Sequence, residues 1–170
     1  GPCHITQIKT QEVDGYSALQ LGFNKIADRR IKKSQTKKPF SVIKEFRSIN
    51  AADLSELKIN DIINVSVFQE GEIVKIRSIS KGKGFQGVVR RYGYKGRQSV
   101  THGTKHELRN LGSVGCQGGV RKGKGMPGRM GSEKITVKNL IIAKIDGENN
   151  ILALKGAVPG HKGSIVEIRG

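Results

Sequence analysis

The sequence has no tryptophan, two methionines, and only eight phenylalanine and tyrosine residues among its 170 residues. Because aromatic side chains contribute much of the apolar area in protein cores, we expect a modest and mainly aliphatic core. No apolar run reaches the roughly 18 residues that a membrane-spanning helix needs. The chain opens with Gly1-Pro2 and shows no charged stretch followed by an apolar one, so no signal peptide is expected.

Cysteine is also scarce. Cys3 and Cys116 are the two cysteines of the chain. They are too few and too far apart for a disulfide framework or a four-cysteine zinc module. A reducing compartment suits them better than an oxidising one.

Acidic residues are outnumbered, with 14 Asp and Glu against 31 Lys and Arg and a net charge of +17. Two segments hold all of the excess. Residues 29–47, the N-terminal basic run, carry eight basic residues and one acidic residue, and residues 81–134, the basic segment, carry thirteen and two. The other 97 residues have a net charge of −1. One charge run is commonly a solvated face, but two beside a neutral remainder favour a polyanionic partner, most simply a nucleic acid.

The near-neutral remainder shows the alternation of half-buried strands. Helix signals are few, and the clearest is a turn or two at 51–57 behind Asn50. Short strands separated by turn signals predict a mainly β fold, either a small barrel or a sandwich. Strands are expected at 16–23 and 62–68, more weakly at 5–10 and 72–78, in a hairpin formed by 140–145 and 151–155, and at 164–169.

The basic segment has a different composition. It contains 14 of the 23 glycines and no sustained hydrophobic period. Such a chain cannot bury enough apolar surface to offset the entropy of ordering, so we expect it to need a partner. Its aromatic residues Phe85, Tyr92 and Tyr94 alternate with cations, which fits phosphate contacts combined with base stacking. Alternatively, Phe85 and Val88–Val89 anchor the segment against the β domain.

Two glycine motifs imitate nucleotide-binding loops. Residues 82–87 match G-x-G-x-x-G, but no βαβ pattern surrounds them and no kinase signature follows. Residues 118–124 resemble a P-loop, yet Gly125 stands where Ser or Thr would bind magnesium. We therefore interpret the glycines as sites of close backbone approach to RNA phosphates.

The sequence offers no complete group of metal ligands and no complete group of catalytic residues. His102 and His106 lie four residues apart and Cys116 follows, but no further ligand completes a zinc site. No nucleophile, base and orienting residue stand out together. The sequence predicts no enzyme activity, no metal site and no cofactor other than magnesium ions that accompany an RNA.

Several blocks resemble the bacterial-type ribosomal large-subunit protein three family, and they occur in family order across nearly the whole chain. These are Asp14–Tyr16, Gln20–Gly22, Ser80–Val88, His102-Gly103, Gly112–Gly115, Lys122–Gly131, Thr136–Leu140 and Leu154–Gly160.

The resemblance implies a translation-factor-like β-barrel formed by 1–80 and 135–170. Within it, the charge of 29–47 predicts a basic loop insert. The resemblance also implies that 81–134 is a long loop reaching through ribosomal RNA toward the peptidyl-transferase centre. Family members begin with a further hairpin containing Gly-Met-Thr, which is absent here, so the barrel is expected to be incomplete. The expected loop tip is Cys116, Gln117, Gly118 and Gly119. Some bacterial members carry a methylated tip glutamine, for which Gln117 is the nearest candidate, although this tip is shorter and lacks the Pro-Gly that usually follows.

The functional hypothesis is a non-enzymatic constituent of the large ribosomal subunit that binds its RNA, nucleates assembly and lies beside other ribosomal proteins. We expect no membrane association, no homo-oligomer, and a ribosome-bound location in the cytoplasm or an organelle. The alternative is a free nucleic-acid chaperone or a DNA- or RNA-compacting protein. The candidate RNA-binding residues are Arg29, Arg30, Lys32, Lys33, Lys37, Lys38, Lys44, Arg47, Lys81, Lys83, Phe85, Arg90, Arg91, Lys95, Arg97, His102, Lys105, His106, Arg109, Arg121, Lys122, Lys124, Arg129 and Lys134.

Overall fold

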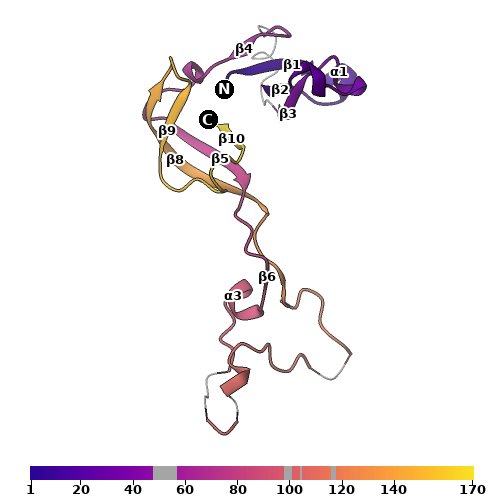
Figure 1. The fold of residues 1–170 in the computed structure, drawn as a ribbon, viewed down its shortest axis with the longest axis vertical. Helices are drawn as coiled ribbons and strands as arrows, with labels where there is room; N and C mark the ends of the chain where they lie inside the picture. Colours follow the sequence, from indigo (N-terminus) through magenta and orange to yellow (C-terminus); the bar gives the residue numbers. More distant parts are fainter. Residues whose placement is uncertain (48–56, 98–100, 104, 116–117) are drawn as a thin grey trace. The chain divides into compact units, whose positions relative to one another are not determined.

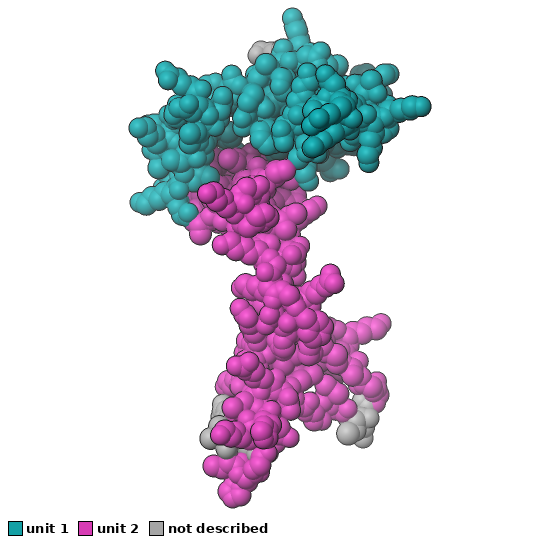
Figure 2. Space-filling view, in the orientation of Figure 1, with its two compact units in different colours: residues 1–73, 141–156, 170 teal, residues 74–140, 157–169 magenta. Residues whose placement is uncertain are grey.

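The computed structural model describes residues 1–47, 57–97, 101–103, 105–115 and 118–170. The fold is mainly β, as the sequence predicts, with three antiparallel sheets and only short helices (Figure 1). Two compact units make up the chain (Figure 2). Unit 1 contains 1–73, 141–156 and 170, and unit 2 contains 74–140 and 157–169. The predicted helix at 51–57 lies almost wholly outside the described residues.

The first sheet has the strand order β3–β2–β1–β4. Its strands are β1 (Cys3–Lys9), β2 (Ala18–Lys25), β3 (Phe40–Arg47) and β4 (Ile62–Ile63). Ile5 and Leu19 are buried at its centre, where Ile8, Leu21, Leu57 and Ile63 pack against them. This small aliphatic core matches the composition.

Short helical turns connect these strands. Helix α1 (Gln11–Asp14) ends at Gly15, whose left-handed backbone closes the turn into β2. Between β2 and β3 lie the 3-10 turns η1 (Asp28–Arg30) and η2 (Lys33–Gln35). The N-terminal basic run therefore comprises these turns and a full strand, β3, which the charge pattern of 29–47 did not indicate.

The second sheet has the order β10–β5–β8–β9. Its strands are β5 (Ile73–Ile79), β8 (Lys134–Asp146), β9 (Ile151–Lys155) and β10 (Val166–Arg169). The predicted hairpin is confirmed, because β8 and β9 pair antiparallel from Ile141↔Lys155 to Asp146↔Ile151. Strand β5 shows the expected alternation, burying Val74, Ile76 and Ser78.

One predicted strand is wrong over most of its length. Residues 62–68 form a strand only at Ile62–Ile63, after which Val65–Val67 make the 3-10 turn η3. The backbone amide of Phe68 donates to the carbonyl of Val65 at 3.1 Å, a local hydrogen bond that replaces a ladder bond. No helix in the described ranges is both long and apolar enough to cross a membrane.

Candidate nucleic-acid interface

The basic segment begins and ends in a narrow two-stranded ladder. Strands β6 (Phe85–Gln86) and β7 (Gly128–Arg129) pair antiparallel. Further backbone bonds extend this ladder, from Lys83 N to Met130 O, from Met130 N to Gly84 O and from Ser80 N to Glu133 O, each 2.9 Å long. Figure 1 shows the two chain paths side by side from β5 and β8 to β6. The ladder therefore brings cations at 81 and 83 beside those at 129 and 134.

A short helix, α3 (Val88–Tyr92), follows β6 and positions an arginine. Val88 is buried and anchors the helix, and Gly93 ends it in a left-handed conformation. The Nη1 atom of Arg91 donates to the carbonyl oxygen of Met126 at 2.8 Å. Its guanidinium also lies over the Tyr92 ring, 5.0 Å from the ring centre. This cation is thereby held on both sides before any partner binds.

Two tyrosines extend this group of cations and rings. The Tyr92 and Tyr94 ring centres are 6.0 Å apart and tilted by 38°. The Lys124 ammonium lies 5.9 Å from the centre of the Tyr94 ring. Gly125 is buried against both rings. We call Arg91, Tyr92, Tyr94 and Lys124 the aromatic cluster, and its rings with neighbouring cations match the chemistry of base stacking beside phosphate contacts.

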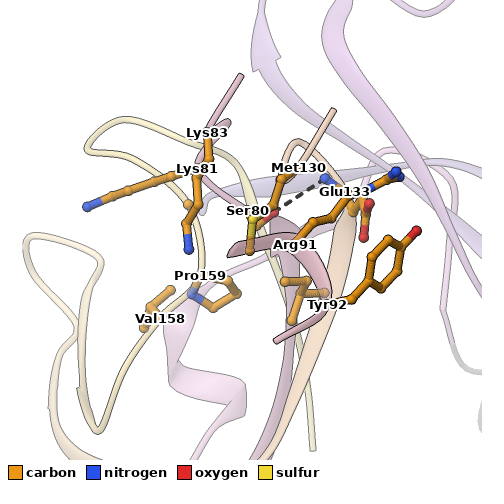
Figure 3. Close-up of a pocket in the computed structure, with 12 residues that line it drawn as sticks. Ser80, Lys81, Lys83, Arg91, Tyr92, Met130, Glu133, Val158 and Pro159 are labelled. Carbon is orange, nitrogen blue, oxygen red and sulfur yellow. Dashed lines mark hydrogen bonds between the residues drawn. The ribbon is translucent and has the colours of Figure 1, made fainter. Parts of the chain in front are cut away.

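A pocket of about 520 Å³ lies next to the aromatic cluster (Figure 3). Lys81, Lys83 and Arg91 supply its positive charge, and Glu133 is its acidic residue. Figure 3 shows Tyr92 on one side and Val158 with Pro159 on the other. All of these residues belong to unit 2.

The outer part of the basic segment presents its charges to solvent. Arg97 forms an ion pair with Glu107, which is one of the two acidic residues of the basic segment. This acidic residue is therefore already neutralised. His102 lies 3.2 Å from the Thr101 hydroxyl. Among the described residues no group of three His, Cys, Asp or Glu side chains could hold a metal ion. The exposed predicted residues here are Lys81, Lys83, Phe85, Arg90, Lys95, Arg97, His102, Lys105, His106, Arg109, Arg121, Lys122, Lys124, Arg129 and Lys134, and Arg91 is half-buried.

The predicted loop tip is only partly described. Gly118 and Gly119 are exposed and have positive φ angles of 71° and 76°. Cys116 and Gln117 lie outside the described residues, so the methylation of Gln117 stays a prediction.

The N-terminal basic run divides into exposed and engaged residues. Its exposed residues between β2 and β3 are Arg29, Arg30, Lys32, Lys33 and Lys37. The half-buried Lys38 instead donates to the side-chain oxygens of Gln7, at 2.7 Å, and Gln20. Lys44 is half-buried within β3, and the Arg47 guanidinium lies 4.8 Å from the centre of the Tyr16 ring. Part of the positive charge of the N-terminal basic run is therefore already engaged in contacts with residues of the first sheet and its connections.

A hydrogen-bonded network centres on Tyr16, whose hydroxyl accepts from Lys9 Nζ at 2.7 Å and donates to Glu45 at 3.0 Å. The Tyr16 hydroxyl, followed by the Gln20 amide, lowers the pKa of Glu45. The hydrogen bond to Tyr16, with a smaller contribution from Glu45, raises the pKa of Lys9 against the opposing effect of its desolvation. The network stabilises a charged pair within unit 1.

Some residues of the pocket were missed by sequence reasoning. Glu133, Val158 and Pro159 lie beside the cations only because the chain returns there. Val158 and Pro159 belong to the block 154–160, which carries part of the family resemblance, so this block could have indicated them.

Fold and site together define a class, a mainly β protein whose excess positive charge lies on two segments, the longer of which is rich in glycine. Comparison with known proteins narrows that class. The family model for ribosomal protein L3 matches residues 41–150. The chain is 40% identical to the large ribosomal subunit protein uL3 of Herpetosiphon aurantiacus, an alignment that covers 99% of this chain and 82% of the relative. It is 42% identical to the proteins of the same name from Pseudothermotoga lettingae and Petrotoga mobilis, covering 99% of this chain and 83% and 82% of those relatives.

The chain therefore belongs to the ribosomal protein L3 family. Proteins of this family are structural components of the ribosome, and the chain is not an enzyme. The resemblance stated from the sequence blocks is thus confirmed.

Proposed function

We propose that this protein is a constituent of the large ribosomal subunit that binds large-subunit ribosomal RNA through its basic segment. The observation that carries the proposal is the ladder at 80–86 and 128–133, which fixes cations beside a preformed aromatic cluster. Phosphate contacts position a protein on RNA, and stacking rings hold unpaired bases. The exposed Arg29, Arg30, Lys32, Lys33 and Lys37 supply a second set of phosphate contacts.

The domain roles follow from this proposal. The β sheets act as a rigid mount, and 81–134 enters folded RNA toward the peptidyl-transferase centre with 116–119 foremost. Binding two RNA regions through one chain would help to nucleate assembly. The protein acts as a single copy beside neighbouring ribosomal proteins, on ribosomes of the cytoplasm or of an organelle, and it needs no cofactor except the magnesium ions of the RNA.

The alternative is a nucleic-acid chaperone that has no specific binding site on the ribosome and uses the same positive charge. Co-sedimentation separates the two functions. Tagged protein expressed in its source cells should remain with large subunits after high-salt washing. Salt displaces a protein that is bound only to surface phosphates, but it does not release a segment that is enclosed by folded RNA. Release of the protein into the wash, with small subunits and free RNA binding it equally well, would favour the chaperone.

A further inference from the structure

The pocket beside the aromatic cluster has a shape that a continuous RNA helix does not fill. Its volume of about 520 Å³ lies within the range of small-molecule sites, and the hollow is partly open to solvent. A phosphate backbone passing over the basic segment would meet the exposed cations but leave this hollow empty. A single nucleotide that projects from its helix has a size suited to this hollow.

The chemistry of the walls indicates what that occupant is. Lys81, Lys83 and Arg91 provide donors for phosphate oxygens at the pocket. The Tyr92 ring and the Val158-Pro159 pair provide apolar surfaces on the two sides that Figure 3 shows. Glu133 lines the same hollow, and within the described part of the chain its carboxylate has no ion-pair partner, which leaves it able to accept a base N–H.

The pocket is also organised before binding. Arg91 is fixed by the Met126 carbonyl and by the Tyr92 ring. Tyr92 in turn packs on the buried Gly125. Groups held in this way lose little conformational freedom when a ligand arrives.

We propose that this pocket binds one unstacked RNA nucleotide, its phosphate at Lys81 and Lys83 and its base against Tyr92, whose ring Arg91 helps to fix. The proposal rests on the proposed function, because it assumes that RNA reaches the basic segment. It adds that recognition there includes a nucleotide turned out of its helix. Single-stranded, bulged or looped nucleotides are the usual targets of such stacking sites.

The test uses the full chain and two synthetic RNA hairpins, one with an uninterrupted stem and one carrying a single bulged adenosine. Dissociation constants are measured by fluorescence anisotropy over a range of salt concentrations. We expect the bulged hairpin to bind about tenfold more tightly, within the range of one base–aromatic stack. Tyr92→Ala should bring the ratio of the two dissociation constants to about 1, and it should also weaken binding of both hairpins because Arg91 loses its contact with the ring, whereas Tyr92→Phe keeps the ring and the preference.

Phe85→Ala is the matched control. Phe85 is an exposed aromatic residue of the same basic segment and does not line the pocket. Its removal should leave the preference for the bulged hairpin intact. If Phe85→Ala abolishes the preference as Tyr92→Ala does, stacking is diffuse and the pocket assignment is overturned.

A second readout does not depend on whether a variant folds. With 2-aminopurine at the bulge, binding to the unaltered protein should change its fluorescence as the base moves onto the Tyr92 ring, and no change contradicts the proposal. Adenosine monophosphate should displace the bulged hairpin only far above the hairpin's dissociation constant. If the protein bound free adenosine monophosphate as tightly as the bulged hairpin, the ligand of the pocket would be a free nucleotide and not a nucleotide of RNA.

The outcomes separate the two proposals. Equal, salt-sensitive binding of both hairpins overturns the nucleotide pocket and leaves ribosomal RNA binding standing. Failure to bind either hairpin or ribosomal RNA in a salt-sensitive way overturns both.

Discussion

At the scale of single residues, two glycines decide where the interface side chains can lie. Gly125 is buried, and a Cβ added there would come within 2.8 Å of the Tyr94 hydroxyl and 2.9 Å of the Tyr92 ring. A Cβ at Gly128 would collide with the Arg91 guanidinium. The glycines of this segment thus include positions at which missing side-chain volume, rather than chain freedom, shapes the proposed RNA-binding surface.

This leads to a prediction for Gly125→Ala. The added methyl group should displace the Tyr92 ring, and because that ring is about half exposed, the loss of stability of unit 2 should lie near the low end for overpacking, about 1 kcal/mol. Because the chain has no tryptophan, tyrosine emission can follow the change during urea unfolding, with Tyr16→Phe as background to remove the signal of unit 1. The control is Gly87→Ala, at φ −70° with no atom near its added Cβ. Equal stability of the two alanine variants would show that the rings do not pack as described.

The Tyr16 network predicts a pH dependence at the same scale. Since the folded pKa of Glu45 is lowered from its ordinary value of 4.5, its contribution to stability is present above about pH 4.5 and is lost as the pH falls through the folded pKa. Glu45→Gln should therefore reduce the acid sensitivity of the melting temperature between about pH 3 and 6. Glu12→Gln, an exposed carboxylate outside the network, should not. If both variants keep the acid sensitivity of the parent, the network does not couple to folding.

At the alkaline end the sign reverses. The pKa of Lys9 is raised above 10.5, so its contribution to stability is present below that pH and is lost as the pH rises through the folded value. Lys9→Met should therefore destabilise the protein at neutral pH and converge with the parent at high pH. A constant difference at every pH would mean that packing, not charge, accounts for the effect of Lys9.

At the scale of elements, the sequence predicted most strands of the near-neutral part. Strand β5 and the β8–β9 hairpin follow directly from alternation and from the turn at 146–150, where Asp146 accepts from the backbone amides of Glu148 and Asn149. Their signals are local, so the sequence suffices. The lowered pKa of Asp146, mainly due to the Asn149 side chain, belongs to the same turn.

Elements that depend on distant partners escaped prediction. Strand β3 lies in a run that its charges marked as loop, and it becomes a strand because it pairs with β2 from Ala18↔Arg47 to Lys25↔Phe40. Helix α3 has β-branched residues and flanking glycines, which are poor helix material, yet Val88 is buried and holds it in place. The charge of the site was predictable, whereas the Arg91–Met126 contact joins residues far apart in sequence and was not.

The outer part of the basic segment supports an element-level prediction. Deleting 112–123 and closing the gap with a Gly-Ser linker keeps the ladder at 80–86 and 128–133. We expect a thermal transition like that of the parent, because every buried residue of the described chain lies outside 112–123. Subunits carrying the variant should assemble or form peptide bonds more slowly, as measured by sucrose-gradient profiles and a puromycin reaction. A lost cooperative transition would refute the proposed division between a folded β mount and a segment that enters RNA.

At the scale of the whole molecule, the charge distribution governs function. Outside the two basic regions the net charge is −1, and inside the first sheet Lys38 and Arg47 already have polar or aromatic partners. The remaining exposed cations have too few acidic neighbours to balance them. A chain so charged repels itself until a polyanion supplies the counter-charge.

The most direct test of this account is the salt dependence of affinity for large-subunit ribosomal RNA, measured with the full chain. If about ten phosphates are neutralised, the affinity should fall by several orders of magnitude between about 50 and 200 mM salt. The double variant Arg121→Gln, Lys122→Gln should lower the slope of log affinity against log salt by about 1 to 2. Affinity that stays constant over this salt range, or a slope that the double variant leaves unchanged, would contradict the account.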